Sequence, residues 1–247
     1  MKRIVIFFCL IPLLSCTSLL PLAPSRPRPE GTFHIQPVRP IAELLPIALA
    51  ATPPTETGNF KPTDLVELTT LDPSIQLDIR YATTNNFLGT ALYSQARAFL
   101  QRPAALALLR VQHALASEGY GLLIHDAYRP WYVTRIFWDA VPSEQHWFVA
   151  DPSQGSRHNR GCAVDLTLID LKTGHEIAMP SLYDEATERA YPSYTGGSAE
   201  QRHMRDFLRQ HMEAEGFTVY EFEWWHFDYR DWKSYAIQNT RFEDLGK

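Results

Sequence analysis

Residues 156–168 read Ser-Arg-His-Asn-Arg-Gly-Cys-Ala-Val-Asp-Leu-Thr-Leu, a polar loop with a histidine that leads into a strand of small and apolar residues. Asp165 lies inside that predicted strand, between two apolar residues. Burying a carboxylate in such surroundings is costly unless the group is paired or bound to a metal. Gly161 permits a tight turn before the strand, so the loop can bring His158 back toward Asp165. The stretch therefore predicts a histidine held beside a buried carboxylate.

Residues 221–229 read Glu-Phe-Glu-Trp-Trp-His-Phe-Asp-Tyr and form the second decisive stretch. A zinc hydrolase needs three protein ligands, an open position for water and a nearby base. His158, Asp165 and His226 can supply the ligands, and Glu223 can supply the base. Residues three apart point to opposite faces of a regular strand, so we expect the strand to end, bend or bulge between Glu223 and His226. The alternative is a loop histidine, a salt-bridged aspartate and an aromatic core strand without a metal.

The remaining patterns predict an α+β fold with a largely antiparallel sheet, because strands and helices occur without regular βαβ repetition. Alternating or continuous apolar residues predict strands at 65–68, 75–79, 121–126, 161–169 and 217–229. Helices are predicted to begin near residues 103, 130 and 198. The last helix has the clearest signal, since Ser198 and Gln201 match a capping box and its apolar residues recur at helical spacing.

Four motifs together resemble a known family. Residues 156–165 match Ser-x-His-x-x-Gly-x-Ala-x-Asp and residues 223–226 match Glu-x-Trp-His, a combination similar to the zinc peptidases of the Hedgehog/DD-peptidase fold. Residues 78–89, Asp-Ile-Arg-Tyr-Ala-Thr-Thr-Asn-Asn-Phe-Leu-Gly, and 126–130, Asp-Ala-Tyr-Arg-Pro, narrow the resemblance to the D-alanyl-D-alanine dipeptidases. The motifs occur in the family's order. The resemblance implies a Hedgehog/DD-peptidase-like fold, with a central, largely antiparallel sheet flanked by helices.

The resemblance also implies roles for individual residues. One Zn²⁺ per chain would be held by the ligands His158, Asp165 and His226. Glu223 would be the general base, and Arg129 would stabilise the transition state; the alternative for Arg129 is a structural salt bridge. Three further residues lie in motifs that line the dipeptide pocket of the family and are predicted to bind substrate: Ser156, Tyr81 and Asn86.

One stretch departs from the family pattern. The family usually has an Asp-Met-Gly-Thr-like sequence after the metal strand, often with Phe-Asp, where residues 178–184 here read Ala-Met-Pro-Ser-Leu-Tyr-Asp. The free amine of a dipeptide needs a carboxylate partner, and the candidates are Asp184 and Glu221. Trp224 and Trp225 either wall the site or pack in the core.

We therefore expect zinc-dependent hydrolysis of D-alanyl-D-alanine, or of a similar small D,D-dipeptide, in cell-wall peptide metabolism. One alternative is a D,D-carboxypeptidase or another murein peptidase, whose substrate groove would be open. Another is a zinc-stabilised binding module that does not cleave, and the presence of both Glu223 and Arg129 argues against it.

Composition narrows the partners. The 247 residues have a net charge of −5 and no basic run, so nucleic acid is not an expected partner. The three cysteines, Cys9, Cys16 and Cys162, cannot build a disulfide framework. Cys162 is interpreted as a small buried strand residue, and the alternative is a thiol nucleophile.

The N-terminus resembles a bacterial lipoprotein signal. Two basic residues precede an apolar run at 4–14, which is shorter than the roughly 20 residues of a membrane-spanning helix. A Leu-Leu-Ser-Cys sequence then ends at Cys16. We expect a signal peptide at 1–16 with a lipidated Cys16, a proline-rich tether at 17–62, and the dipeptidase domain at 63–247. The domain would lie on the periplasmic side of the cell envelope, anchored to the membrane. Plain cleavage and an uncleaved anchor are the alternatives, and the apolar residues 41–51 can dock on the domain or form a short helix.

Overall fold

The computed structural model describes residues 33–246, so the predicted signal peptide, the lipidated Cys16 and tether residues 17–32 lie outside the described residues. A five-stranded sheet has the order β2-β4-β5-β7-β6, and a separate two-stranded sheet pairs β1 with β3. The strands are β1 (Leu65–Glu67), β2 (Gln76–Leu77), β3 (Phe99–Gln101), β4 (Tyr120–Asp126), β5 (Ala163–Asp170), β6 (Phe217–Tyr220) and β7 (Glu223–Tyr229). Among the strands of the described residues, only β2 and β4 pair in parallel. The predicted α+β class with a largely antiparallel sheet is confirmed.

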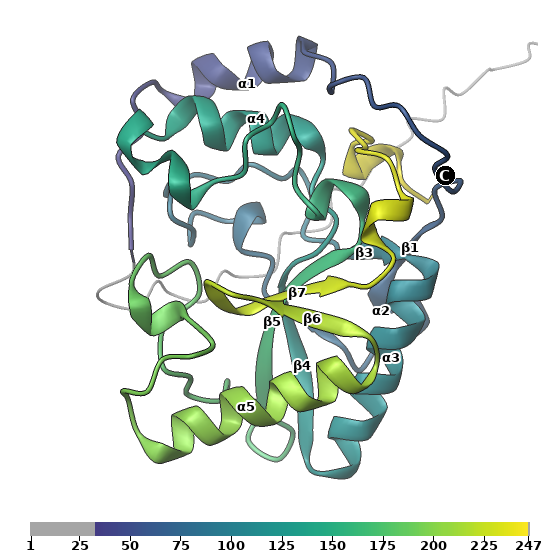
Figure 1. The fold of residues 1–247 in the computed structure, drawn as a ribbon, viewed down its shortest axis with the longest axis vertical. Helices are drawn as coiled ribbons and strands as arrows, with labels where there is room; N and C mark the ends of the chain where they lie inside the picture. Colours follow the sequence, from purple (N-terminus) through teal and green to yellow (C-terminus); the bar gives the residue numbers. More distant parts are fainter. Residues whose placement is uncertain (1–32, 247) are drawn as a thin grey trace, which may run out of the picture.

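Helices flank this sheet (Figure 1). The α-helices are α1 (Ile41–Ala50), α2 (Leu68–Leu71), α3 (Arg102–Ser117), α4 (Trp131–Ala140) and α5 (Ala199–Ala214). α3 and α5 lie beside the lower part of the sheet in Figure 1, and α1 lies along α4 at the top. The capping box of Ser198 and Gln201 begins α5 as predicted. No helix within residues 33–246 is long and apolar enough to cross a membrane.

The central strands are covered on both faces. Every residue of β5 from Ala163 to Ile169 is buried, and so are the six residues of β4 after Tyr120. Such strands show continuous burial rather than alternation because packed elements lie on both sides of the sheet. A polar side chain between Ala163 and Ile169 therefore lies inside the protein, and the sheet places Asp165 there.

The single strand predicted at 217–229 is wrong, because the segment is a hairpin of β6 and β7 with its turn at residues 221–222. The hairpin register is irregular: Val219 faces Phe227, but the next residue, Tyr220, faces Glu223. Moving one residue along β6 therefore shifts the cross-strand partner by four residues along β7. This irregularity confirms the distortion predicted between Glu223 and His226.

The described part of the predicted tether is not extended throughout. Residues 41–50 form α1, whose buried side chains pack on α4, and Ile35 donates its N–H to the carbonyl of Phe87. Apolar residues recur along one side of α1, with Ile41, Leu44 and Ala48 buried. Their burial outweighs the cost of Pro46 inside the helix, so residues 33–50 are packed on the folded domain. The docked short helix considered for residues 41–51 is present.

Candidate active site

The three predicted metal ligands converge from three elements. His158 lies on the 3₁₀ helix η3 (His158–Arg160), Asp165 on β5 and His226 on β7. Asp165 and His226 are direct partners in the antiparallel register of β5 and β7. Gly161 follows η3 in the left-handed conformation, with φ at 68°, and a Cβ there would lie 2.5 Å from the side chain of Leu65. Glycine therefore permits the turn that brings His158 onto the strand.

Neighbouring acceptors determine which nitrogen of each ring faces the cluster. Nδ1 of His158 lies 2.7 Å from the carbonyl oxygen of Ala127, and Nε2 of His226 lies 3.0 Å from Oδ1 of Asp228. Each acceptor oxygen accepts a hydrogen bond from the N–H of the ring nitrogen beside it, which leaves the other ring nitrogen to face Asp165. Metal-binding histidines are oriented by such second hydrogen bonds.

The ligand atoms themselves form a tight triangle. Oδ1 of Asp165 lies 3.2 Å from Nε2 of His158 and 2.9 Å from Nδ1 of His226, and the two nitrogens are 3.1 Å apart. The buried Oδ1 has no hydrogen-bond partner. Three convergent acceptors repel one another unless a positive charge lies between them, and two nitrogens with a carboxylate oxygen are typical zinc ligands. The residues therefore fit a divalent cation.

Electrostatic properties of the cluster agree with that fit. Burial lowers the pKa of His226, but the neighbouring carboxylates of Asp165 and Asp228 outweigh the burial and raise the pKa to about 10. Burial opposes ionisation of Asp165, yet the two histidines hold its pKa well below the usual range. The cluster thus attracts positive charge strongly, which is the property that a cation site needs.

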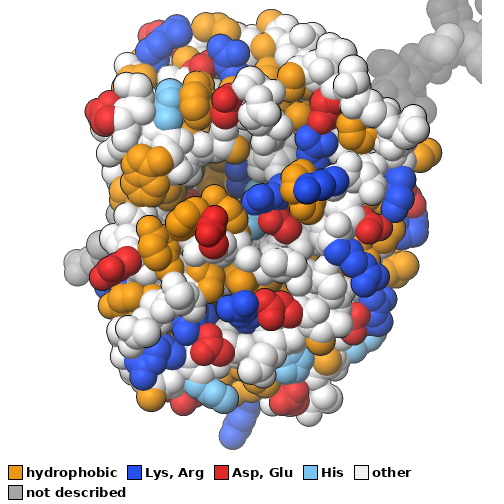
Figure 2. Space-filling view, in the orientation of Figure 1, with side chains coloured by type: hydrophobic (Ala, Val, Ile, Leu, Met, Phe, Trp, Pro, Cys, Tyr) orange, Lys and Arg blue, Asp and Glu red, His pale blue; other side chains and the backbone are white. Residues whose placement is uncertain are grey.

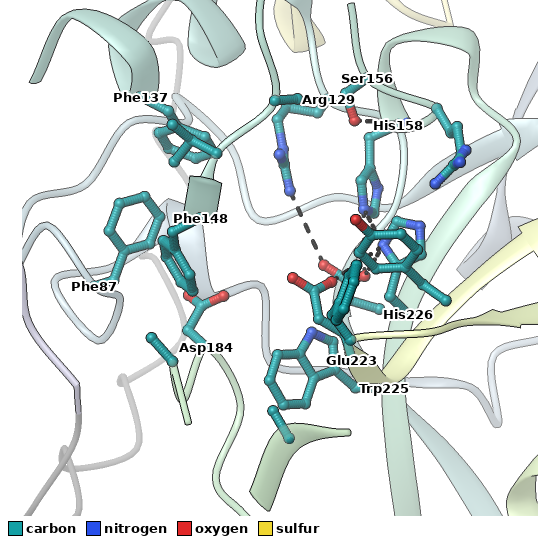
Figure 3. Close-up of a pocket in the computed structure, with 18 of the residues that line it drawn as sticks. Phe87, Arg129, Phe137, Phe148, Ser156, His158, Asp184, Glu223, Trp225 and His226 are labelled. Carbon is teal, nitrogen blue, oxygen red and sulfur yellow. Dashed lines mark hydrogen bonds and ion pairs between the residues drawn. The ribbon is translucent and has the colours of Figure 1, made fainter. Parts of the chain in front are cut away.

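Glu223 lies beside the ligand triangle. Its Oε2 is 3.7 Å from Nδ1 of His226, and Figure 3 shows its carboxylate close to the ligand cluster, between Asp184 and His226. Burial raises the pKa of Glu223, and the charge of Asp165 adds to this effect. A carboxylate with a raised pKa is a better proton acceptor at neutral pH than an ordinary one.

Arg129 is held rigidly at the same site. Its Nε and Nη2 donate to Oδ2 of Asp126 at 2.9 and 2.7 Å, and its guanidinium lies over the rings of Tyr81 and Phe137. Nη2 also lies 4.0 Å from Oδ2 of Asp165. The salt bridge considered for Arg129 exists, and it points the guanidinium into the site rather than away from it.

These groups line one cavity of about 760 Å³. Figure 2 shows a hollow on this face that hydrophobic side chains border. In Figure 3, Asp184 lies on one side of the ligand cluster near Phe87 and Phe148, and Ser156 lies on the other side. The cavity therefore has a carboxylate at one end and a hydroxyl at the other.

The predicted substrate residues divide into two groups. Tyr81, Ser156 and Asp184 line the cavity, and the hydroxyl of Tyr81 donates to Asp184 at 3.1 Å. Asn86 is not among the lining residues: its side-chain amide donates to backbone carbonyls of its own loop, and its Oδ1 accepts the N–H of Leu88. The motif containing Asn86 shapes the loop after Tyr81. Glu221 is exposed at the hairpin turn and is not among the lining residues.

Trp224 and Trp225 have different positions relative to the cavity. Trp225 lines the cavity, whereas Trp224 does not and donates its Nε1–H to Oγ of Ser181 at 2.8 Å. That hydrogen bond ties β7 to the stretch that departs from the family pattern.

Cys162 is fully buried, and burial raises its pKa to about 12, which favours the structural interpretation over a thiol nucleophile.

Three residues at the site have no role predicted from the sequence, namely Arg157, Tyr183 and Asp228. Arg157 lines the cavity, stacks between Tyr220 and Trp232, and pairs with Asp228 at 3.2 Å. The position of Asp228, two residues after His226 on one strand face, was a usable signal. Tyr183 was not recognisable, because its contact with Asp165 depends on the path of an irregular loop.

The family model and the curated relatives that match this chain agree with one another. Residues 61–244 match the family model described as D-Ala-D-Ala dipeptidase. The chain is 34% identical to the D-alanyl-D-alanine dipeptidase of Escherichia coli strain K12, over 73% of this chain and 92% of the relative. It is 35% identical to that of Enterococcus faecium, over 64% and 87%, and 37% identical to that of Enterococcus faecalis, over 62% and 85%. Among solved structures it is similar to the LdcB LD-carboxypeptidase, with 19% identity, a TM-score of 0.41 and coverage of 75% and 79%.

Proposed function

This chain belongs to the D-Ala-D-Ala dipeptidase family of zinc metallopeptidases, and we propose that it hydrolyses D-alanyl-D-alanine or a similar small D,D-dipeptide in cell-wall peptide metabolism. The proposal includes one Zn²⁺ per chain on His158, Asp165 and His226. The observation that carries it is the convergence of these three acceptors beside Glu223.

The protein side chains have separate tasks in the hydrolysis. Zn²⁺ held by His158, Asp165 and His226 would supply a Lewis acid that activates water near neutral pH. Glu223 accepts a proton from the attacking water and passes it to the leaving amine. Arg129, fixed by Asp126, stabilises the negative charge that develops on the carbonyl oxygen. Its rigid mounting means that little reorganisation accompanies the reaction.

The two ends of the cavity carry different groups, so the dipeptide binds in one orientation. Asp184 binds the free amine: burial raises its pKa well above the usual range, and the charges of Asp165 and Glu223 add to this, so a substrate ammonium is the partner that favours its ionised form. At the other end, Ser156 accepts a backbone N–H and keeps its own proton to donate. Arg157 beside it is partly exposed, and both face the substrate carboxylate.

The buried amine end favours a dipeptidase over a carboxypeptidase. A longer stem peptide would have to continue past Asp184, which is only 6% exposed and bonded to the buried Tyr81. Phe87 and Phe148 pack edge to face at the same end. A free ammonium group is small enough to fit beside Asp184. A nitrogen that continues into a further residue of a longer peptide is too large for this place.

The discriminating experiment combines metal analysis with two substrates. The purified chain should contain one zinc per molecule and should hydrolyse D-Ala-D-Ala, and it should leave a muropeptide ending in D-Ala-D-Ala uncleaved. Removal of zinc with a chelator should abolish the hydrolysis, and added Zn²⁺ should restore it. Cleavage of the muropeptide at a comparable kcat/KM would support the carboxypeptidase alternative, and zinc binding without any hydrolysis would support the binding module.

The location in the cell envelope is a further part of the proposal. Its support is the sequence of the first sixteen residues, with a basic start, an apolar run and Cys16. Labelling of the full chain with a radioactive fatty acid in a bacterial host should depend on Cys16, and label retained in Cys16→Ala would contradict lipidation at this residue.

A further inference from the structure

Two buried tyrosine hydroxyls lie between the metal ligand Asp165 and the amine-binding Asp184. The hydroxyl of Tyr183 donates to Oδ2 of Asp165 at 2.9 Å. Its oxygen lies 3.3 Å from that of Tyr81, whose hydroxyl donates to Asp184 at 3.1 Å. Because Oδ2 of Asp165 is occupied by this hydrogen bond, Oδ1 is the oxygen left to face His158 and His226.

The ring of Tyr183 is fixed from several sides. It packs against His125, with 4.8 Å between ring centroids, and edge to face against Trp225 at 5.5 Å. The guanidinium of Arg80 lies 5.7 Å from its centroid, and the residue is only 5% exposed. A ring held on these sides presents its hydroxyl in one place, so the hydrogen bond to Asp165 selects one orientation of the carboxylate.

The backbone brings Tyr183 and Asp184 to the same site. Adjacent side chains in extended backbone point in opposite directions. Asp184 instead has a φ of 60°, which makes it the one non-glycine residue with positive φ among residues 33–246. This left-handed conformation is tolerated by aspartate better than by most residues. It turns the chain so that Tyr183 reaches Asp165 while Asp184 reaches Tyr81.

We propose that Tyr183 is a positioning residue: its hydroxyl holds Asp165 so that Oδ1 faces the other two predicted metal ligands, and its oxygen lies beside the Tyr81 hydroxyl that orients the amine-binding Asp184. Both parts rest on the proposed function: the part that concerns Asp165 rests on its metal site, and the part that concerns Asp184 rests on its binding of the dipeptide amine. The resembled family often has Phe-Asp here, so the hydroxyl is an addition to that pattern and Tyr183→Phe keeps the ring that the core needs.

The test is the zinc affinity of the full chain, measured by competition with a chromophoric chelator. Tyr183→Phe should weaken zinc binding about tenfold, the lower end of the usual effect of losing a residue that orients a metal ligand. Tyr128→Phe is the matched control: it removes another buried hydroxyl, which bonds the carbonyl of Thr240, and it should leave the zinc affinity unchanged. A zinc affinity of Tyr183→Phe within twofold of wild type would overturn the proposal.

Tyr81→Phe separates the effect on Asp184 from the effect on Asp165. It removes the hydroxyl that donates to Asp184 and keeps the bond between Tyr183 and Asp165, so KM for D-Ala-D-Ala should rise severalfold while zinc affinity stays unchanged. An equal loss of zinc affinity in both variants would contradict the specific role of Tyr183. A wild-type chain that binds zinc but leaves D-Ala-D-Ala intact would refute the proposed function and leave the metal part of this test unaffected.

Discussion

The two sides of the cavity are built in different ways. On the metal side, β5 and β7 are neighbouring strands, and their backbone register alone sets Asp165 opposite His226. On the amine side, Asp184 lies in an irregular stretch that side chains fasten in place. Trp224 donates to Ser181 at 2.8 Å, Arg189 donates to the Pro180 carbonyl at 2.8 Å, and Gln201 donates to that of Met179 at 3.0 Å.

This difference indicates where the chain can change its substrate without losing its chemistry. Strand register is a collective property of many backbone hydrogen bonds, and shifting it would move every side chain of the strand. A loop fastened by single side chains can be reshaped by a few substitutions, and loops on a rigid scaffold commonly determine specificity. The departure from the family pattern at residues 178–181 lies on the amine side. We therefore expect changes on the metal side to reduce kcat and changes on the amine side to raise KM.

The largest effect should come from Glu223→Gln. The amide keeps the shape of the side chain but cannot accept the proton of water, so kcat for D-Ala-D-Ala should fall by about 10³-fold, within the usual range for a lost general base. Zinc content and KM should change little, which metal analysis and steady-state kinetics measure. Activity within tenfold of wild type would show that Glu223 is not the base.

The acid limb of the pH profile should report the same residue. Burial raises the pKa of Glu223 above that of an ordinary glutamate, and only its ionised form accepts a proton. The value of kcat/KM should therefore fall as the pH is lowered through this raised pKa, at a higher pH than an exposed glutamate would give. The profile of Glu223→Gln, measured on its residual activity, should lack that limb, and an unchanged limb would assign it to another group.

The next largest effect should be on the amine side. Asp184→Asn removes the charge that pairs with the substrate ammonium and keeps a side chain that can bond Tyr81. KM for D-Ala-D-Ala should rise about a hundredfold, as for the loss of one partner of a buried charge pair, while zinc affinity stays close to wild type. Glu188→Gln, a change at an exposed carboxylate on the cavity rim, is the control and should alter KM less than twofold. A fall in kcat without a rise in KM would remove the distinction between the two sides.

A smaller effect is expected at the carboxylate end. Arg157→Gln should raise KM for D-Ala-D-Ala about tenfold, since a charge-assisted hydrogen bond at a partly exposed site is lost. The same variant should cleave D-alanyl-D-alaninamide as well as wild type does, because the amide has no charge to pair. Zinc content must be measured alongside, since Arg157 also pairs with Asp228 beside His226. Equal losses on both substrates would mean that Arg157 acts through Asp228 rather than on the substrate.

The same difference explains how much the sequence could predict. On the metal side, the sequence pattern is sufficient to identify His158, Asp165 and His226, because they are polar residues within apolar strands or near a turn glycine. The distortion at Glu223 follows from the alternation of side chains along a strand. The hairpin at residues 221–222 was missed because the apolar pattern continues across the turn. β6 and β7 thus read as one strand.

On the amine side, the local sequence pattern predicts fewer of the contacts that the structure shows. The motif that contains Asn86 predicts a pocket residue, but in the structure its side-chain amide donates to loop carbonyls. The contact of Tyr183 with Asp165 spans an irregular loop and depends on the left-handed backbone of Asp184. Neither periodicity nor spacing encodes such a path. For residues 41–51 the sequence leaves open whether they dock on the domain or form a short helix. The packing partner of α1 is α4, which lies some ninety residues away in the sequence, so local pattern does not show the contact.

The smallest effect should be at Cys162, which lies within the metal-side motif but outside its chemistry. The thiol is fully buried, and burial raises its pKa to about 12, so it stays protonated and unreactive at neutral pH. Iodoacetamide at pH 7.5 should leave the activity of the folded chain unchanged, and Cys162→Ala should keep kcat within about twofold of wild type. A large loss of kcat in Cys162→Ala with zinc still bound would revive the thiol nucleophile. Loss of zinc in that variant would instead mean that packing under β5, as well as strand register, holds the ligands in place.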